Sequence, residues 1–347
     1  MLTLSYTPYT LHFKTPVLTS RGEMRVKNGF FVRISDGEKT GVGECSFIED
    51  LSRDDLLNLE SKIQLLATDF DKLNNHFDIF ENEKEALYEQ FPSLLFAIET
   101  ALIDLKNGGK QILFPSDFTA GKRAIPINGL IWMGDRDFML KQIQQKMQDG
   151  FRCIKIKVAA IDFEEECRLI SFIRERFPAS QMEIRLDANG GFSEKDVLKK
   201  LERLATFDIH SIEQPVKQKQ WKLMQKICAK KIIDVALDEE LVHTISVEEK
   251  NEMLDFIKPQ YIILKPSLIG GLAKSDEWIS LAEKRKIKWW ATSALESNIG
   301  LNAIAQWVSA KHVSAIQGLG TGSLYMNNIE SPLKVYNGAL HYKPQND

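Results

Sequence analysis

Two lysines stand one residue apart in the apolar segment "CIKIKVA" at residues 153–159. Successive side chains of a β-strand point to opposite faces, so Lys155 and Lys157 share one face of such a strand. On an exposed strand this pair would be ordinary. In a strand covered on both faces, two ammonium groups would be very costly unless negative charge lies nearby. The neighbouring segments therefore decide what this pair can do.

Carboxylates that could supply this charge occur in the next three apolar runs. Asp187 lies in "EIRLDAN", Glu213 in "SIEQP" and Asp238 in "DVALDEE". A further run, "YIILKPSL", carries Lys265 near the same end. A lone acid after a strand is usually a helix cap or a solvated loop residue, and a lone Lys-x-Lys pair usually marks an exposed strand. Charges at the same end of five successive runs favour a shared site instead.

Oxygen ligands without cysteine or histidine suit a hard cation, so the three carboxylates predict a Mg²⁺ site, with Mn²⁺ as an alternative. Nearby positive charge lowers the pKa of a lysine, which can then act as a base near neutral pH. A metal ion would stabilise the enolate that forms when a proton is removed next to a carboxylate. These residues therefore predict a small-molecule carboxylate as the substrate.

The elements that position these residues follow from the rhythm of the chain. From Ala124 onward, short apolar runs alternate with amphipathic segments such as "FEEECRLISFIRERF", which is typical of a parallel β/α barrel. The carboxyl ends of barrel strands form the active-site face, so the charged residues would meet there. The eight runs are "AIPINGLIWM", "CIKIKVA", "EIRLDAN", "SIEQP", "DVALDEE", "YIILKPSL", "WWATSALE" and "SAIQGLG".

The first 120 residues have a different pattern. Alternating segments, "LTLSYTPYTLHF" and "NGFFVRISDGEKTGVGECS", predict hairpin strands. "SRDDLLNLESKIQLLATDFDKL" and "PSLLFAIETALIDLKN" predict helices that complete an α+β unit beside the barrel. The last residues, "PLKVYNGALHYKPQND", predict a strand or an extended tail.

The composition excludes several classes of function. The 347 residues carry a net charge of −3, so there is no global positive field for nucleic acid. Four scattered cysteines without a Cys-x-x-Cys pair argue against structural zinc and a disulfide framework, which fits the reducing cytoplasm. The first residues lack a signal-peptide pattern and no apolar run has the length of a membrane span, so we expect no membrane association. The oligomeric state stays open.

Taken in order, Lys-x-Lys, "LDAN", "IEQP", "LDEE" and "LKP" resemble the motifs of the enolase superfamily, in its muconate-lactonizing subgroup. The resemblance covers nearly the whole chain. It implies an α/β fold in which residues 121–318 form a modified (β/α)7β TIM-type barrel. Residues 1–120 would form an N-terminal α+β capping domain, joined by the C-terminal tail, about 319–347.

The resemblance also implies a role for each charged residue. Lys157 would be the catalytic base, Lys265 its partner on the opposite wall, and Lys155 would lie behind Lys157 and tune it. The metal ligands would be Asp187, Glu213 and Asp238. Two loops of the capping domain would close over the substrate, and "TSRGE" and "GECSFIEDLS" look like those loops.

Within the subgroup, "LKPSLIGG" and "TSALESNIGLNAIAQ" are most similar to the o-succinylbenzoate synthase family. Its members are lyases that dehydrate 2-succinyl-6-hydroxy-2,4-cyclohexadiene-1-carboxylate to o-succinylbenzoate in menaquinone synthesis. Dipeptide epimerases carry an Asp-x-Asp after the eighth strand to hold the substrate ammonium, whereas this chain has "IQGLGTG" there. The substrate contacts that this resemblance implies are Arg185, Asn189, Thr292, Ser293, Gly318, Ser20 and Arg21.

Other functions stay open on the sequence alone. An N-acylamino acid racemase or a dipeptide epimerase of the same superfamily would use the same two lysines. A Schiff-base aldolase would instead form an imine on Lys157 or Lys265 and hold a phosphate with "GLGTG". Borohydride trapping and activity in EDTA would support the aldolase. A non-catalytic binding barrel would have no need of three acids and three lysines.

Overall fold

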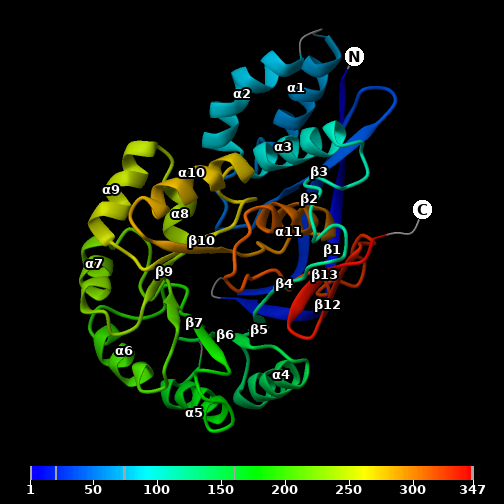
Figure 1. Ribbon diagram of the computed structural model, residues 1–347. Helices are drawn as coiled ribbons and strands as arrows, with labels where there is room; N and C mark the ends of the chain where they lie inside the picture. Colours follow the sequence, from blue (N-terminus) through cyan, green and yellow to red (C-terminus); the bar gives the residue numbers. More distant parts are fainter. Residues whose placement is uncertain (1, 20–21, 73–75, 160, 345–347) are drawn as a thin grey trace.

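The computed structural model describes residues 2–19, 22–72, 76–159 and 161–344, and their strands form three sheets. A three-stranded antiparallel sheet with three helices stands above a curled, seven-stranded parallel sheet that is ringed by helices (Figure 1). The third sheet is a small one near the C-terminus. The arrangement matches the α/β barrel with an N-terminal α+β unit that the sequence predicts.

The N-terminal sheet is closely covered by one helix. A glycine at position 43 permits this, because a Cβ atom there would lie 1.9 Å from the Ala97 carbonyl oxygen. A side chain would therefore push the helix off the sheet. The elements of this unit, called the cap below, are β1 (Thr3–Thr19), β2 (Gly22–Ser35), β3 (Thr40–Ser46), α1 (Leu59–Lys72), α2 (His76–Gln90) and the covering helix α3 (Pro92–Lys106).

The barrel sheet has parallel pairing between all neighbouring strands. The eighth predicted run forms no strand in the part of the chain that the structure describes. Instead, Gln317 makes a parallel bridge to Ile127 and Gly318 makes one to Thr292, and these bridges close the ring. The strands are β5 (Gly129–Ile131), β6 (Cys153–Lys157), β7 (Glu183–Asp187), β8 (Ser211–Glu213), β9 (Val235–Leu237), β10 (Tyr261–Leu264) and β11 (Lys288–Ala291).

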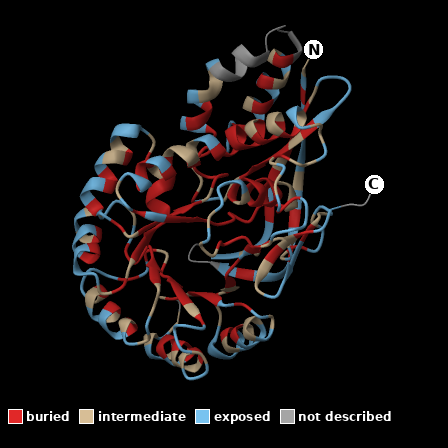
Figure 2. Cartoon of the chain, viewed as in Figure 1, coloured by how far each residue is buried: buried red, intermediate tan, exposed pale blue. Residues whose placement is uncertain are grey.

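Helices cover the outside of this sheet, and their solvent-facing sides are exposed (Figure 2). Several begin at capping residues whose side chains accept backbone N–H bonds, as Asp162 and Ser297 do. The helices are α4 (Arg136–Gln148), α5 (Phe163–Arg174), α6 (Val197–Ala205), α7 (Trp221–Lys230), α8 (Glu239–His243), α9 (Val247–Ile257), α10 (Gly271–Glu283) and α11 (Asn298–Ala310). No helix among the described residues is long and apolar enough to cross a membrane.

Strand alternation separates two environments in the barrel. Ile154 and Ile156 of β6 belong to the large core between the sheet and the helices. The alternate residues, Lys155 and Lys157, point into the ring. Deeper in the ring lies a separate apolar cluster that includes Ile263 and Trp290, so the interior is packed below the lysines. The charged side chains that a ligand could reach therefore lie at the carboxyl ends of the strands.

The C-terminal segment contacts both units. A hairpin of β12 (Leu333–Tyr336) and β13 (Ala339–Tyr342) pairs with β4 (Ile125–Pro126), the strand that leads into the barrel. Just before it, the backbone N–H of Met326 donates to the carbonyl of His12 in β1 at 2.8 Å. The predicted terminal strand is therefore a hairpin that belongs to the third sheet.

Candidate active site

Register brings the charged residues of neighbouring strands to one level. Lys157 of β6 pairs with Asp187 of β7, and Asp187 pairs with Glu213 of β8. Glu213 in turn pairs with Ala236 of β9, two residues before Asp238. Since adjacent strands lie roughly 4.8 Å apart, these side chains meet at the carboxyl end of the barrel.

The three lysines are held by carboxylates. The Lys157 Nζ lies 2.6 Å from an Asp187 oxygen, and the Lys155 Nζ lies 2.9 Å from the same oxygen. Lys155 also contacts a Glu213 oxygen at 2.5 Å, and Lys265 forms an ion pair with Asp238. Lys265 stands on β10's carboxyl end, across the ring from Lys157. The ion pairs to Asp187 and Glu213 therefore balance the positive charges of the two lysines in "CIKIKVA".

Burial and opposite charge pull the pKa values of these groups in different directions. Asp187 is 0% exposed; burial raises its pKa, but the ammonium groups of Lys155 and Lys157 outweigh burial and hold the pKa well below its usual value. Burial and the charge of Asp187 raise the pKa of Glu213. Glu213 is thus the carboxyl group of this pair that takes a proton more readily.

Carboxylates dominate the surroundings of two of the lysines and set the direction of their pKa shifts. Burial lowers the pKa of Lys155, but the carboxylates of Asp187, Glu213 and Asp238 outweigh burial and raise it. Lys265 behaves in the same way, chiefly through Asp238. Each of these two lysines faces more carboxylates than ammonium groups in this structure. The prediction that positive charge lowers their pKa values concerns the site with its cation bound, and it stays a prediction.

Asn189 and Glu239 form a second layer around Lys157. The Lys157 Nζ donates to Asn189 Oδ1 at 2.5 Å, and the Asn189 side chain donates to Glu239 at 2.9 Å. Asn189 has a φ of 43°, in the left-handed region, and its backbone N–H donates to Asp187 at 3.1 Å. Sequence reasoning missed Glu239, although the second acid of "LDEE" was a signal for it. The layer fixes where the Lys157 ammonium lies.

The carboxylate set has the chemistry of a site for a hard cation. The carboxylates come from adjacent strands, and Glu213 Oε1 is buried without a hydrogen-bond partner among the described residues. As the side chains stand, no three Asp, Glu, His or Cys residues of the described chain converge closely enough to hold a metal ion, and lysines lie between the carboxylates. An all-oxygen donor set with one unused buried oxygen fits Mg²⁺.

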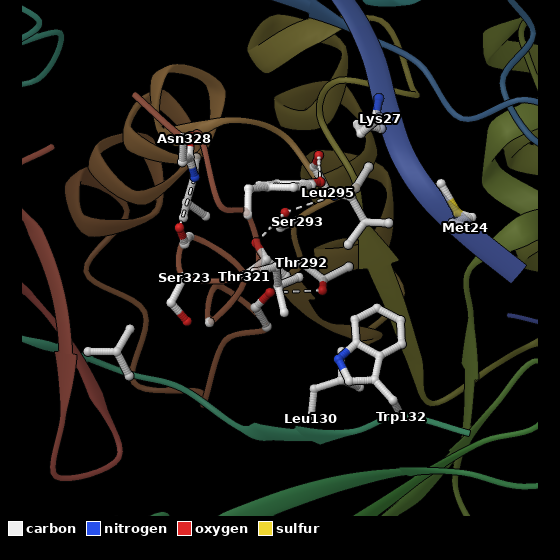
Figure 3. Close-up of a pocket in the computed structure, with 18 of the residues that line it drawn as sticks. Met24, Lys27, Leu130, Trp132, Thr292, Ser293, Leu295, Thr321, Ser323 and Asn328 are labelled. Atoms are coloured by element: carbon white, nitrogen blue, oxygen red, sulfur yellow. Dashed lines mark hydrogen bonds between the residues drawn. The ribbon is translucent and has the colours of Figure 1, made fainter. Parts of the chain in front are cut away.

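A cavity of about 1170 Å³ lies above these residues, between the barrel and the cap. Its floor includes Lys155, Lys157, Asp187 and Lys265. Strand β2, with Met24 and Lys27, forms part of its cap side, and Leu130 and Trp132 line another wall (Figure 3). The cavity is large enough for a drug-sized small molecule, and it places that molecule directly against the lysines.

Comparison with known proteins places the chain in a family. The family described as "Enolase C-terminal domain-like" matches residues 139–345. An o-succinylbenzoate synthase of Desulfotalea psychrophila is 45% identical over 97% of this chain and 98% of its own length. The chain belongs to the enolase superfamily. The resemblance inferred from the five motifs is thereby confirmed.

Solved structures of the superfamily share the fold. The crystal structure of MenC from Desulfotalea psychrophila has a TM-score of 0.87, 42% identity, and coverage of 98% of this chain and 99% of that chain. An o-succinylbenzoate synthase structure from Thermosynechococcus elongatus, described as complexed with Mg in the active site, has a TM-score of 0.73 and 24% identity, covering 91% and 92% of the chains. The second likeness speaks for the fold alone.

Four of the contacts expected for a superfamily substrate line the cavity: Asn189, Thr292, Ser293 and Gly318. The Ser293 hydroxyl donates to Glu296 at 2.6 Å and accepts from Thr321 at 2.7 Å and from the Leu295 N–H at 3.0 Å. One hydroxyl has one donor and two acceptor positions, so Ser293 has no hydrogen-bonding capacity left. It shapes the wall, and Glu296 and Thr321, which the sequence did not single out, hold it there.

The other expected contacts lie elsewhere. Arg185 is absent from the described residues that line the cavity, although Lys155, its partner in the register, is among them. Its guanidinium donates to Glu183 at 2.6 Å and lies 4.1 Å from the Trp290 ring centroid. Arg185 therefore packs the barrel interior, which corrects its expected place in the pocket. Ser20 and Arg21 lie outside the described residues, and residues 47–51 of the second predicted loop line the cavity.

Proposed function

We propose that this chain is an o-succinylbenzoate synthase. The reaction removes water from 2-succinyl-6-hydroxy-2,4-cyclohexadiene-1-carboxylate to give o-succinylbenzoate, a step of menaquinone biosynthesis, in the cytoplasm. The observation that carries the proposal is the 45% identity over nearly the full length of a synthase. The paired lysines at the floor of one cavity support the same chemistry.

The roles of the lysines follow from their opposite positions. Lys157 is proposed as the base that takes the ring proton next to the substrate carboxylate, and Asn189 holds its ammonium in place afterwards. Lys157 then gives that proton to the departing hydroxyl, so the ring loses H⁺ and OH⁻, which leave as one water. Lys265, across the ring of strands, stabilises the anionic intermediate by its charge. Lys155, between Asp187 and Glu213, positions both carboxylates.

The residues proposed to hold Mg²⁺, with Mn²⁺ as an alternative, are Asp187, Glu213 and Asp238. When bound there, the ion would supply Lewis-acid stabilisation of the negative charge that develops on the substrate carboxylate. The unused Glu213 oxygen supports this assignment. The synthase from Thermosynechococcus elongatus, which shares the fold, is described with Mg in its own active site.

One assay tests the function. The purified protein is mixed with the cyclohexadiene substrate, with Mg²⁺ and with excess EDTA, and the aromatic product is followed by its ultraviolet absorbance. We expect product only with the divalent cation. Failure of the protein with Mg²⁺ to form the aromatic product would overturn the proposal, and equal rates in EDTA would overturn the metal assignment.

The same assay separates the alternatives. Residues 318–322, Gly-Leu-Gly-Thr-Gly, contain no acid that could hold the ammonium of a dipeptide, which disfavours a dipeptide epimerase. An N-acylamino acid racemase would exchange the α-proton of its substrate without forming an aromatic product. A Schiff-base aldolase would form no aromatic product, would stay active in EDTA and would be trapped by borohydride.

A further inference from the structure

Lys27, on β2 of the cap, is a buried lysine without a carboxylate partner. It is 2% exposed, and no carboxylate oxygen of a residue that the structure describes lies within ion-pair distance of its Nζ. The Nζ donates to the Phe47 carbonyl and contacts the Asn28 carbonyl at 3.4 Å. The Phe47 ring centroid lies 5.3 Å from the Nζ. An ammonium group carries three donors, so one N–H has no oxygen or nitrogen acceptor in the described structure.

Other buried lysines of the chain are paired. Lys155 contacts two carboxylates, and Lys250, which is 0% exposed, lies 2.6 Å from a Glu277 oxygen. Burial of a cation without such a partner is costly, and burial lowers the pKa of Lys27. The chain keeps this charge at a wall of the active-site cavity, which Lys27 lines (Figure 3).

The nearest acids are committed to other groups. Glu44 and Glu296 act on Lys27 by charge and oppose the effect of burial, but neither forms an ion pair with it. Glu44 accepts from Tyr9 at 2.5 Å and from the Gly300 N–H at 2.8 Å. Glu296 accepts from Ser293, as described above. The positive charge of Lys27 is therefore only partly balanced by the chain, and a bound anion would balance the rest.

The position of Lys27 selects the end of the substrate that it meets. Glu44, which shares the barrel-facing side of the cap sheet with Lys27, accepts from the Ser297 N–H at 2.7 Å, at the start of α11. Lys27 therefore stands over the β11 side of the ring. The proposed metal ligands come from β7, β8 and β9, on the other side. A molecule anchored by one carboxylate at those strands would extend its other end toward Lys27.

We propose that Lys27 binds the second carboxylate of a dicarboxylate substrate, the one at the free end of the acyl chain. This rests on the proposed function, in which the substrate carries one carboxylate on the ring and another on its succinyl chain. The chain carboxylate would take the unused N–H of Lys27 and supply the missing negative charge. Lys27 would then set specificity for diacids without touching the reacting atoms.

The test compares two substrates in two proteins. The substrates are the diacid and its analogue with the chain carboxylate converted to a carboxamide; the proteins are the parent and Lys27→Met, which keeps the length of the stem. For the parent we expect the carboxamide to raise KM about tenfold or more, with little change in kcat. For Lys27→Met we expect the diacid to behave like the carboxamide. Lys146→Met, at another lysine of the cavity wall, is the control and should keep the parent's preference.

The preference for diacid over carboxamide is a ratio within one protein, so partial loss of folded enzyme does not change it. If Lys27→Met kept the parent's ratio, Lys27 would serve only to hold the Phe47 loop, and the inference would be wrong. If the parent turned over neither substrate, the proposed function would fail first. Calorimetry with o-succinylbenzoate and its chain carboxamide would then still test Lys27, and equal affinities for the parent protein would overturn the inference.

Discussion

Glu99 joins the cap to the barrel and should make the stability of the protein depend on pH. Its carboxylate, on α3, accepts the backbone N–H groups of Leu272, at 2.5 Å, and Ala273, at 2.9 Å, in the first turn of α10. Burial raises its pKa from the ordinary 4.5 to about 7, although these N–H groups act in the opposite direction. The folded state thus holds the proton more tightly than the unfolded state.

The sign of the effect follows from that tighter binding. The stability that Glu99 contributes is fully present below pH 4.5 and is lost as the pH rises to about 7. The two pKa values correspond to roughly 2–3 kcal/mol lost between pH 5 and pH 8, at 1.36 kcal/mol for each unit. Glu99→Gln keeps an acceptor for the helix but cannot ionise, so it should lack this loss.

Urea unfolding of the parent and of Glu99→Gln at pH 5 and pH 8 measures the difference. Other buried acids titrate in both proteins, so only the difference between the two pH-dependent losses reports Glu99. Glu89→Gln, at an exposed position of the neighbouring helix α2, is the control and should behave like the parent. If the parent and Glu99→Gln lost equal free energy between the two pH values, burial would not be holding a proton on Glu99.

Three further outcomes are expected. Lys157→Ala should lower dehydration by about 100- to 10,000-fold and abolish exchange of the α-proton of an unreactive carboxylate analogue in heavy water, whereas Lys265→Ala should retain exchange by NMR; the reverse pattern would make Lys265 the base. Asp187→Asn should weaken Mg²⁺ binding at least about tenfold by calorimetry, and unchanged affinity would remove Asp187 from the ligand set. Gly43→Ala should lower the free energy of unfolding by about 1–3 kcal/mol in urea, because its Cβ would lie 1.9 Å from the Ala97 carbonyl; an unchanged value would mean that α3 shifts freely.

The parts of the site that the sequence predicts are those that repeat. Lys155, Lys157, Asp187 and Glu213 fall on strands of the same type at the same end, so alternation and parallel register are enough to bring them together. The eighth run was harder, because only Gln317 and Gly318 bridge to their neighbours. Gln317 and Gly318 exchange backbone hydrogen bonds with the segments on either side, but two residues are too few to be assigned as a strand.

Two properties of the site could not be predicted from the sequence. One is where a side chain inside the ring lies along the barrel axis, and the other is the net electrostatic field at each lysine. Alternation correctly turns Arg185 into the ring with Asp187, but the Arg185 guanidinium donates to Glu183 and to the Ile316 carbonyl, whereas Lys155, its partner in the register, lines the cavity. Likewise, the pKa of Lys265 depends on how many carboxylates surround it, which no spacing in the sequence reveals. The resemblance implied that Arg185 contacts the substrate, whereas the structure shows that its side chain packs inside the barrel.

Charge balance separates the lysines of the cavity into two kinds. Lys155, Lys157 and Lys265 meet Asp187, Glu213 and Asp238, so the floor of the cavity balances within the chain. The floor residues could be predicted from the sequence because a buried strand lysine needs an acidic partner on a neighbouring strand. Lys27 lies in the cap, outside the pattern of barrel strands, and the nearby acids Glu44 and Glu296 form hydrogen bonds with other groups. The unpaired charge of Lys27 can be recognised only from the folded structure. An anionic ligand that binds there would supply the negative charge that the chain does not.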